Sequence, residues 1–81
     1  MREYYKSIYN RAYEVYSSDN EEETKSILNS LTKSQLLDLN KELDIINLNK
    51  NDSKEQIIKD LIFFGIKWDR DRRAIQTVNI R

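Results

Sequence analysis

The sequence predicts a small all-α domain of four helices, and three observations support this prediction. Pro is absent and Gly occurs only once, so almost the whole chain is compatible with helix. Apolar residues recur three and four positions apart, which places them on one face of a helix. The Asn-Gly and Asp-Gly pairs that favour β-hairpins do not occur. We therefore expect residues 1–81 to form a single domain, near the lower size limit for a hydrophobic core.

The first helix is expected over residues 2–16. Its apolar face consists of six residues: Tyr5, Ile8, Tyr9, Ala12, Tyr13 and Tyr16. We expect Tyr9 and Tyr13 to lie in the core. Because Tyr is enriched at protein interfaces, three tyrosines are candidate contacts with a partner protein or with a second copy in a homodimer: Tyr4, Tyr5 and Tyr16.

The second helix is expected after the polar residues 17–20, which favour caps over helix interiors. Asp19 is the expected N-cap, and Glu22 is placed to complete the capping interaction. The apolar stripe of this helix is short: Thr24, Ile27, Leu28 and Leu31.

The third helix is expected to begin at Thr32, which forms a capping box with Gln35. Its buried face consists of Leu36, Leu39, Leu43 and Leu37. Residues 44–51 follow as a linker without Gly or Pro, in which three apolar residues alternate with polar ones: Ile45, Ile46 and Leu48. This alternation predicts an extended segment that packs against the core instead of a flexible loop.

The fourth helix has two possible starts. One is Asp52, with Glu55 three residues later, and the alternative cap pair is Ser53 with Gln56. The apolar surface of this helix is wide: Ile57, Ile58, Leu61, Ile62 and Phe64. Gly65 is expected to end the helix, because Gly is favoured just beyond a helix C-terminus.

The C-terminal residues 67–81 are rich in basic side chains, with five basic and two acidic residues. One further helical turn is expected around residues 69–75. The last five residues are compatible with a strand, a docking segment or disorder.

A family resemblance covers residues from about 28 to 64. It is carried by the following positions: Leu31, Thr32, Leu36, Leu39, Leu43, Ile45, Lys54, Ile57, Ile58, Leu61 and Ile62. Their spacing resembles the helix–extended loop–helix group, which includes SAP domains and the N-terminal domain of the transcription terminator Rho. The resemblance implies two short helices that cross at an angle around an apolar linker. It divides the chain into a helical extension (1–30), a helix–extended loop–helix unit (31–66) and a basic tail (67–81).

The resemblance also implies DNA binding by a small non-enzymatic module. Seven residues are candidate nucleic-acid contacts: Lys50, Ser53, Lys54, Lys67, Arg70, Arg72 and Arg73. The Ser53 hydroxyl and the start of the fourth helix suit a phosphate, although a solvated loop with an ordinary cap is the alternative. We expect DNA or RNA to contact this loop, with the Arg-rich tail adding contacts and affinity falling steeply with salt.

Trp68 has two interpretations. A position in the core is favoured, because a domain this small needs its large apolar side chains. The alternative is an exposed Trp68 that stacks on a base or contacts a partner protein. Together with Phe63 and the tyrosines, an exposed Trp68 supports a second hypothesis, a protein-interaction module or a phage or mobile-element inhibitor of a host protein. The Asn-, Lys- and Ile-rich composition is compatible with a phage protein.

Several function classes are disfavoured by composition. Cys and His are both absent, which removes disulfides, the usual zinc ligands and Cys–His or Ser–His catalysis. Asp69 and Asp71 are expected to pair with neighbouring arginines instead of a metal, so we expect no enzyme activity, cofactor or metal. No apolar run approaches the roughly 20 residues of a membrane span, and a cytoplasmic location without membrane contact is expected. The net charge of zero argues against strong non-specific nucleic-acid binding.

Overall fold

Helix-favouring residues and side-chain caps determine the architecture of this protein. The computed structural model describes residues 2–72, which fold into an all-α domain as the sequence predicts. The elements in chain order are α1 (Arg2–Ser17), α2 (Glu21–Asn29), α3 (Lys33–Leu43), α4 (Lys54–Asp60) and the π-helical segment η1 (Leu61–Lys67). Residues 68–72 continue η1 as α-helix, so one unbroken helical run extends over residues 54–72.

The caps of α3 and α4 match two of the predicted pairs. The Gln35 amide donates to Thr32 Oγ1 at 3.1 Å, and the Thr32 amide donates to Gln35 Oε1 at 2.9 Å. This capping box confirms the predicted start of α3. The Gln56 amide donates to Ser53 Oγ at 3.2 Å, so Ser53 and not Asp52 is the N-cap of α4.

The predicted cap of α2 is wrong by one residue. Asn20 is the N-cap, and its side-chain oxygen accepts from the Glu23 amide at 3.2 Å. Asp19 instead adopts a left-handed φ of 63°, and its amide donates to the Tyr16 carbonyl at 2.9 Å. Asp19 therefore closes the end of α1, because a short polar side chain tolerates the left-handed conformation that this closure requires.

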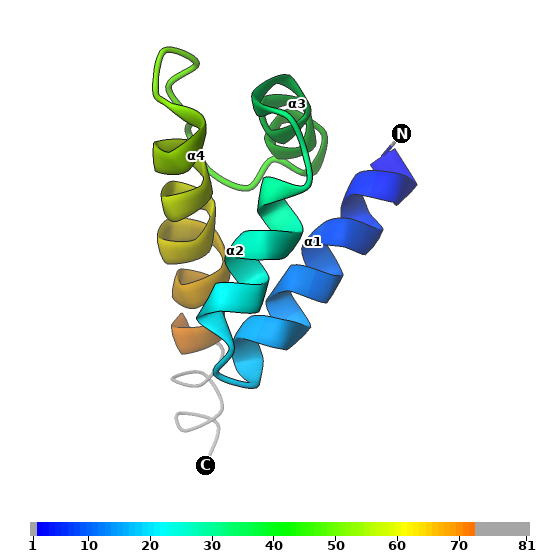
Figure 1. Ribbon diagram of the computed structural model, residues 1–81, viewed down its shortest axis with the longest axis vertical. Helices are drawn as coiled ribbons and strands as arrows, with labels where there is room; N and C mark the ends of the chain where they lie inside the picture. The colour runs from blue at the N-terminus through cyan, green and yellow to red at the C-terminus, as the bar shows by residue number, and fades with distance from the viewer. Residues whose placement is uncertain (1, 73–81) are drawn as a thin grey trace.

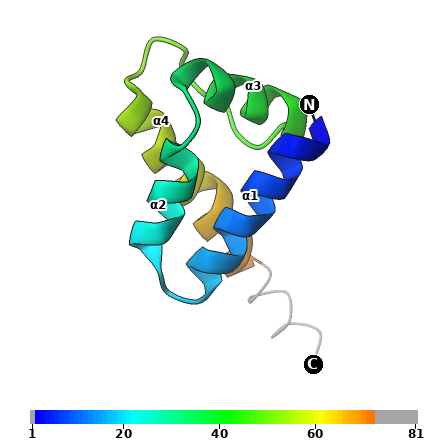
Figure 2. The same ribbon diagram turned by 45° about the vertical axis from the view of Figure 1, so that its right-hand side comes forward.

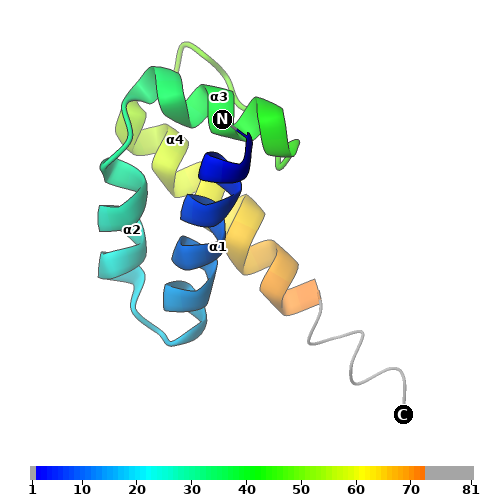
Figure 3. The same ribbon diagram turned by 90° about the vertical axis from the view of Figure 1, so that its right-hand side faces the viewer.

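The helices pack around one core. α1 and α2 lie side by side and antiparallel, and the run that begins with α4 descends beside α2 (Figure 1). α3 lies across the N-terminal end of α1, as the rotated views show (Figures 2 and 3). The last described turn lies close to the turn that joins α1 and α2 (Figure 1).

The core lies between these helices. Its buried apolar residues come from all of the elements: Tyr5, Ala12, Leu28, Leu31, Leu36, Leu39, Ile57, Ile58, Leu61, Ile62 and Ile66. Thr24 is the buried polar residue among them, and its hydroxyl donates toward the Ala12 carbonyl at 3.2 Å and the Asn20 carbonyl at 3.0 Å. The absence of a side chain beyond Cβ at Ala12 lets α1 and α2 approach closely at this contact.

The linker between α3 and α4 packs against the core as predicted. Ile45, Ile46 and Leu48 are half-buried and contact the core residues. Asn40 fixes the linker, because its side-chain amide donates to the Ile46 carbonyl at 2.7 Å and accepts from the Ile46 amide at 3.0 Å. These two bonds satisfy both backbone groups of Ile46 without a neighbouring strand.

Gly65 does not end a helix, in contrast to the prediction. It lies inside η1 and is buried, with no positive φ. A Cβ atom at this position would lie 2.9 Å from Ile45 Cγ2 and 3.1 Å from the Tyr9 hydroxyl oxygen. Gly65 is therefore required where the helix passes close to the linker and to α1.

Candidate docking surface

Three large aromatic side chains project from the solvent side of the C-terminal helical run. Phe63 is 60% exposed, Phe64 is 59% exposed and Trp68 is 64% exposed. We call these three residues the aromatic face. The prediction that Trp68 lies in the core is wrong, and the alternative prediction of an exposed Trp68 is confirmed.

The π-helical geometry of η1 explains this exposure. Buried residues in this run recur every four positions, in two parallel series: Ile57, Leu61 and Gly65, and Ile58, Ile62 and Ile66. An ordinary α-helix of 3.6 residues per turn would instead place Phe64 and Trp68 on the stripe of Leu61. Because a π-helix has a wider turn, Ile66 enters the core and both aromatic residues rotate outward.

The aromatic face is organised internally. The rings of Phe63 and Phe64 meet edge to face, with centroids 5.7 Å apart. The Lys67 ammonium lies 5.5 Å from the Phe63 ring centroid and is 3.0 Å from a carboxylate oxygen of Asp71. A Lys⁺ over an aromatic ring is attracted by the ring quadrupole, so Lys67 holds one edge of the face in place.

A groove lies beside the aromatic face, between the start of α2 and the run from α4 into η1. Its volume is about 340 Å³, and its apolar lining residues are Ile62, Phe63 and Phe64. Its rim is polar and carries both signs of charge: Glu21, Lys25, Gln56, Lys59 and Asp60. The aromatic face and the polar rim, which carries equal numbers of basic and acidic residues, thus lie on one exposed surface.

The candidate nucleic-acid residues at the start of α4 are partly engaged within the protein. Ser53 Oγ caps α4, and the Lys54 ammonium donates to the Asn29 carbonyl at the end of α2, at 2.9 Å. The groove at the start of α4 is lined by three lysines, Lys25, Lys54 and Lys59, and by the acidic residues Glu22 and Glu55. Lys50 is exposed in the loop. An anion at this groove would therefore meet two carboxylates as well as three lysines, so the groove has only a small excess of positive charge.

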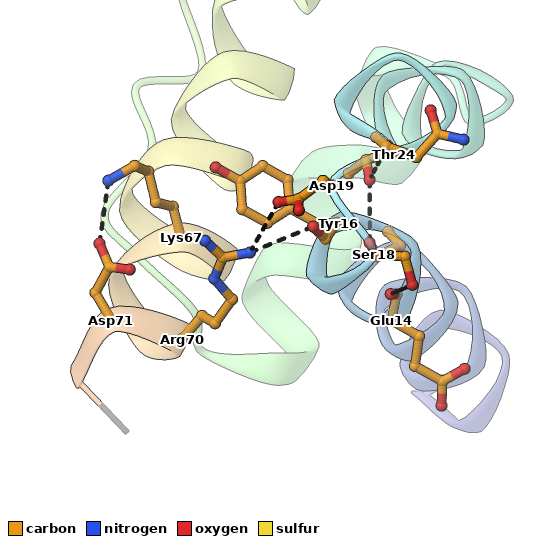
Figure 4. Close-up of polar contacts among 10 residues, drawn as sticks. Glu14, Tyr16, Ser18, Asp19, Thr24, Lys67, Arg70 and Asp71 are labelled. Carbon is orange, nitrogen blue, oxygen red and sulfur yellow. Dashed lines mark hydrogen bonds and ion pairs between the residues drawn. The ribbon is translucent and has the colours of Figure 1, made fainter. Parts of the chain in front are cut away.

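The basic residues near the end of the described chain are paired with acidic groups. Lys67 pairs with Asp71, and the Arg72 guanidinium lies 3.4 Å from an Asp69 carboxylate oxygen. Arg70 lies over the Tyr16 ring, at 5.0 Å from its centroid (Figure 4). Its guanidinium also approaches the Tyr16 carbonyl and the Asp19 carboxylate, at 3.4 Å and 3.9 Å (Figure 4). Arg73 lies outside the described residues.

These two basic groups do not form one surface. Lys54 and Arg70 lie 16 residues apart on the same helical run, which corresponds to at most roughly 24 Å along the helix axis. The structure therefore places the loop lysines at one end of the described residues and Arg70 and Arg72 at the other.

The tyrosines of α1 have different environments. Tyr5 is only 2% exposed, so it is not available to a partner, in contrast to the prediction. A hydrogen bond with the Asp38 carboxylate, together with burial, raises the pKa of Tyr5. Tyr16 is half-buried beneath Arg70, whereas Tyr4 is 52% exposed and stays accessible.

Tyr9 and Tyr13 are half-buried against the core, close to the last described helical turn. The Tyr13 hydroxyl donates to an Asp69 carboxylate oxygen at 3.0 Å and so connects α1 to this turn. Burial, with smaller contributions from Asp69 and Tyr13, raises the pKa of Tyr9 to about 12. Burial has this effect because it disfavours the phenolate.

Comparison with known proteins finds no matching family model, no matching curated protein and no matching solved structure. The helix–extended loop–helix resemblance therefore stays a prediction from residue spacing. Within residues 2–72, no helix combines the length and the apolarity that crossing a membrane requires. In the same residues, no cluster of three or more Asp and Glu side chains is suited to a metal.

Proposed function

We propose that this protein is a small protein-interaction module that docks a partner protein through the aromatic face. The observation that carries the proposal is the joint exposure of Phe63, Phe64 and Trp68 on one helical run. Single exposed apolar residues are ordinary, but a contiguous apolar patch on a small protein marks an interaction site.

The composition of the surface supports this function. Protein interfaces concentrate aromatic residues at the centre, where water is excluded, and place polar residues at the rim. The aromatic face follows this arrangement, with Lys59 and Asp60 on one side and Lys67 and Asp71 on the other. Trp and Phe bring large contact areas with few rotatable bonds, so ordering them on binding costs little entropy.

The fold does not use the aromatic face for its own stability. Ile57, Leu61 and Ile66 on the opposite side of the run are fully buried, and the core is formed without the three aromatic side chains. Full burial of one such side chain is worth about 1.5–3 kcal/mol, and the exposed rings forgo most of this gain in the isolated chain. A partner that covers them would recover it.

Nucleic-acid binding, through the loop before α4, the start of α4 and the arginines, stays a prediction and is the second candidate. The exposed Lys50 favours it. The pairing of Lys67 and Arg72 with carboxylates and the distance between the two basic groups weigh against it. Its test is the binding of labelled DNA and RNA at low salt, with and without the Lys50→Ala substitution.

Site-specific photo-crosslinking tests the proposed function. A photoreactive phenylalanine analogue replaces Phe63, and the matched control carries it at Tyr4, an exposed aromatic position on α1 outside the aromatic face. Both variants are irradiated in a lysate of cells that produce the protein, with purified chain added. We expect adducts to protein, whether to another protein or to the same chain, from position 63 and not from position 4.

Equal labelling from the two positions, or no adduct from position 63, would refute docking at the aromatic face. Crosslinks to DNA or RNA from position 63 would also contradict the proposal, because they would assign the rings to base stacking.

A further inference from the structure

We infer that the aromatic face is occupied by a second copy of this chain, packed antiparallel with a two-fold axis between Phe63 and Phe64. This inference rests on the proposed function and names the partner of the same surface. Cyclic dimers with a self-complementary patch are the commonest soluble oligomers.

The order of side chains along the helical run carries the argument. Asp60 stands three residues before Phe63, and Lys67 stands three residues after Phe64. In an antiparallel pair centred between the two Phe residues, Asp60 of each copy therefore faces Lys67 of the other. The two-fold axis produces this opposite-charge contact twice.

Two further contacts follow from the same axis. Phe63 faces Phe64 of the second copy, and Lys59 faces Trp68 of the second copy. A Lys⁺ over a Trp ring is a favourable cation–π arrangement, and the paired Phe rings form an apolar centre. A parallel pair would instead place Lys59, Asp60 and Lys67 opposite their own copies, which repels.

Net charge also favours a second copy over a strongly charged partner. The chain carries 14 basic and 14 acidic residues, so two copies approach without net repulsion. Along the helical run, the aromatic face is flanked by two basic and two acidic residues, Lys59, Asp60, Lys67 and Asp71, which gives no excess of either sign to attract a polyanion or a polycation. Alternating charge is complementary to itself when one copy is reversed.

The size of the surface sets the expected strength. Three aromatic rings that are three-fifths exposed supply on the order of 300–450 Å² per copy, compared with about 800 Å² per partner in a stable interface. The rim residues, spread along roughly 22 Å of helix from Gln56 to Asp71, add to this area. We therefore expect a reversible dimer of folded monomers and not an obligate one.

Charge reversal in two separate variants tests the antiparallel dimer. Asp60→Lys places two ammonium groups opposite each other across the axis, and Lys67→Asp places two carboxylates there. Sedimentation velocity should show a monomer–dimer equilibrium for the wild-type chain and a dissociation constant raised at least about tenfold in each variant. An equimolar mixture of the two variants should form a dimer again, because both contacts are then between opposite charges.

The matched control is Lys6→Asp, an equal charge reversal at an exposed position of α1, which should leave the dimer unchanged. Circular dichroism verifies that each variant is folded. A wild-type chain that stays monomeric at several hundred micromolar overturns the inference without any variant. Variants that dimerise like the wild type, or a mixture that does not associate, overturn the antiparallel geometry.

The crosslinking experiment separates this failure from failure of the proposed function. A monomeric chain whose position 63 crosslinks to a different protein retains the docking function but excludes self-association. A monomeric chain without crosslinks overturns both.

Discussion

The two sides of the helical run over residues 54–72 contrast sharply, although both are rich in large apolar residues. The inner side carries Leu61, Gly65 and Ile66, which are all buried, and Gly65 lies against Ile45 of the linker and Tyr9 of α1. The outer side carries the aromatic face, which is about three-fifths exposed. The inner side holds the fold together, and the outer side is free to contact a partner.

This contrast shows that the number of residues per helical turn determines which apolar residues are buried. With α-helical spacing, one stripe would contain Leu61, Phe64 and Trp68 and would serve only the core. The wider turn of η1 separates these residues onto two sides. One short sequence thus supplies both a core and a candidate docking surface.

The largest effect is expected from the inner side. Leu61→Ala removes a fully buried side chain and should lower the free energy of unfolding by about 2–5 kcal/mol. Urea denaturation followed by circular dichroism measures this change. A loss below about 0.5 kcal/mol would show that the inner side is not packed as described.

Gly65→Ala should have the next largest effect. It should lower the stability of the protein, whereas helix propensity alone would raise it. In an ordinary helix this substitution stabilises by about 0.5–1 kcal/mol. Here the new Cβ would approach Ile45 Cγ2 to 2.9 Å, and overpacking should destabilise the protein by about 1–3 kcal/mol. The double variant Gly65→Ala/Ile45→Ala should lose less stability than the sum of its single variants, as measured by urea denaturation.

Tyr13→Phe should have a moderate effect. It removes the hydroxyl that donates to Asp69 and should lower the free energy of unfolding by about 0.5–1.5 kcal/mol. Tyr4→Phe on the exposed part of α1 is the control and should leave stability unchanged. Equal stability of the two variants would indicate that the hydrogen bond to the last turn contributes nothing.

Phe64→Ala should hardly change the stability of the monomer. The side chain is exposed, so the free energy of unfolding should change by no more than about 0.5 kcal/mol, in contrast to Leu61→Ala. Urea denaturation at low protein concentration measures this change. The same variant should weaken docking at the aromatic face, as measured by sedimentation. A large loss of monomer stability would place Phe64 in the core and remove the contrast between the two sides.

Ionisation of Tyr9 affects stability only in alkaline solution. Its folded pKa of about 12 exceeds the unfolded value of 10, so the folded state holds the proton more tightly. The free energy of unfolding should therefore be unaffected by this group below pH 10 and should fall as the pH rises toward 12. Tyr9→Phe should flatten this fall in pH-dependent denaturation, and an unchanged slope would argue against burial of the phenol beside Gly65.

Much of the fold can be predicted from the sequence, because local signals specify it. The cap pairs Thr32 with Gln35 and Ser53 with Gln56 are visible as residue types at fixed spacing. The inward-facing linker is visible as alternation around Ile46. The choice between Asp19 and Asn20 as the N-cap of α2 cannot be predicted from the sequence, because both are good caps and only the backbone closure of α1 distinguishes them.

The candidate docking surface could be predicted only in part. The exposed aromatic alternative for Trp68 was visible, but the exposure of Phe64 depends on the π-helical turn, which has no signal in residue spacing. The role of Gly65 depends on contacts with Ile45 and Tyr9, which are 20 and 56 residues away in sequence. The pairing of Arg70 with the end of α1 is likewise a long-range contact that periodicity does not report.

Trp68 offers the most direct test of the claim that the aromatic face docks a second copy. It is the only Trp in the chain and lies on this face, so its fluorescence reports the surface without any label. Acrylamide quenching should be weak in concentrated protein and should increase on dilution, as the dimer dissociates and exposes the indole. Strong quenching that is identical at every concentration would contradict the claim.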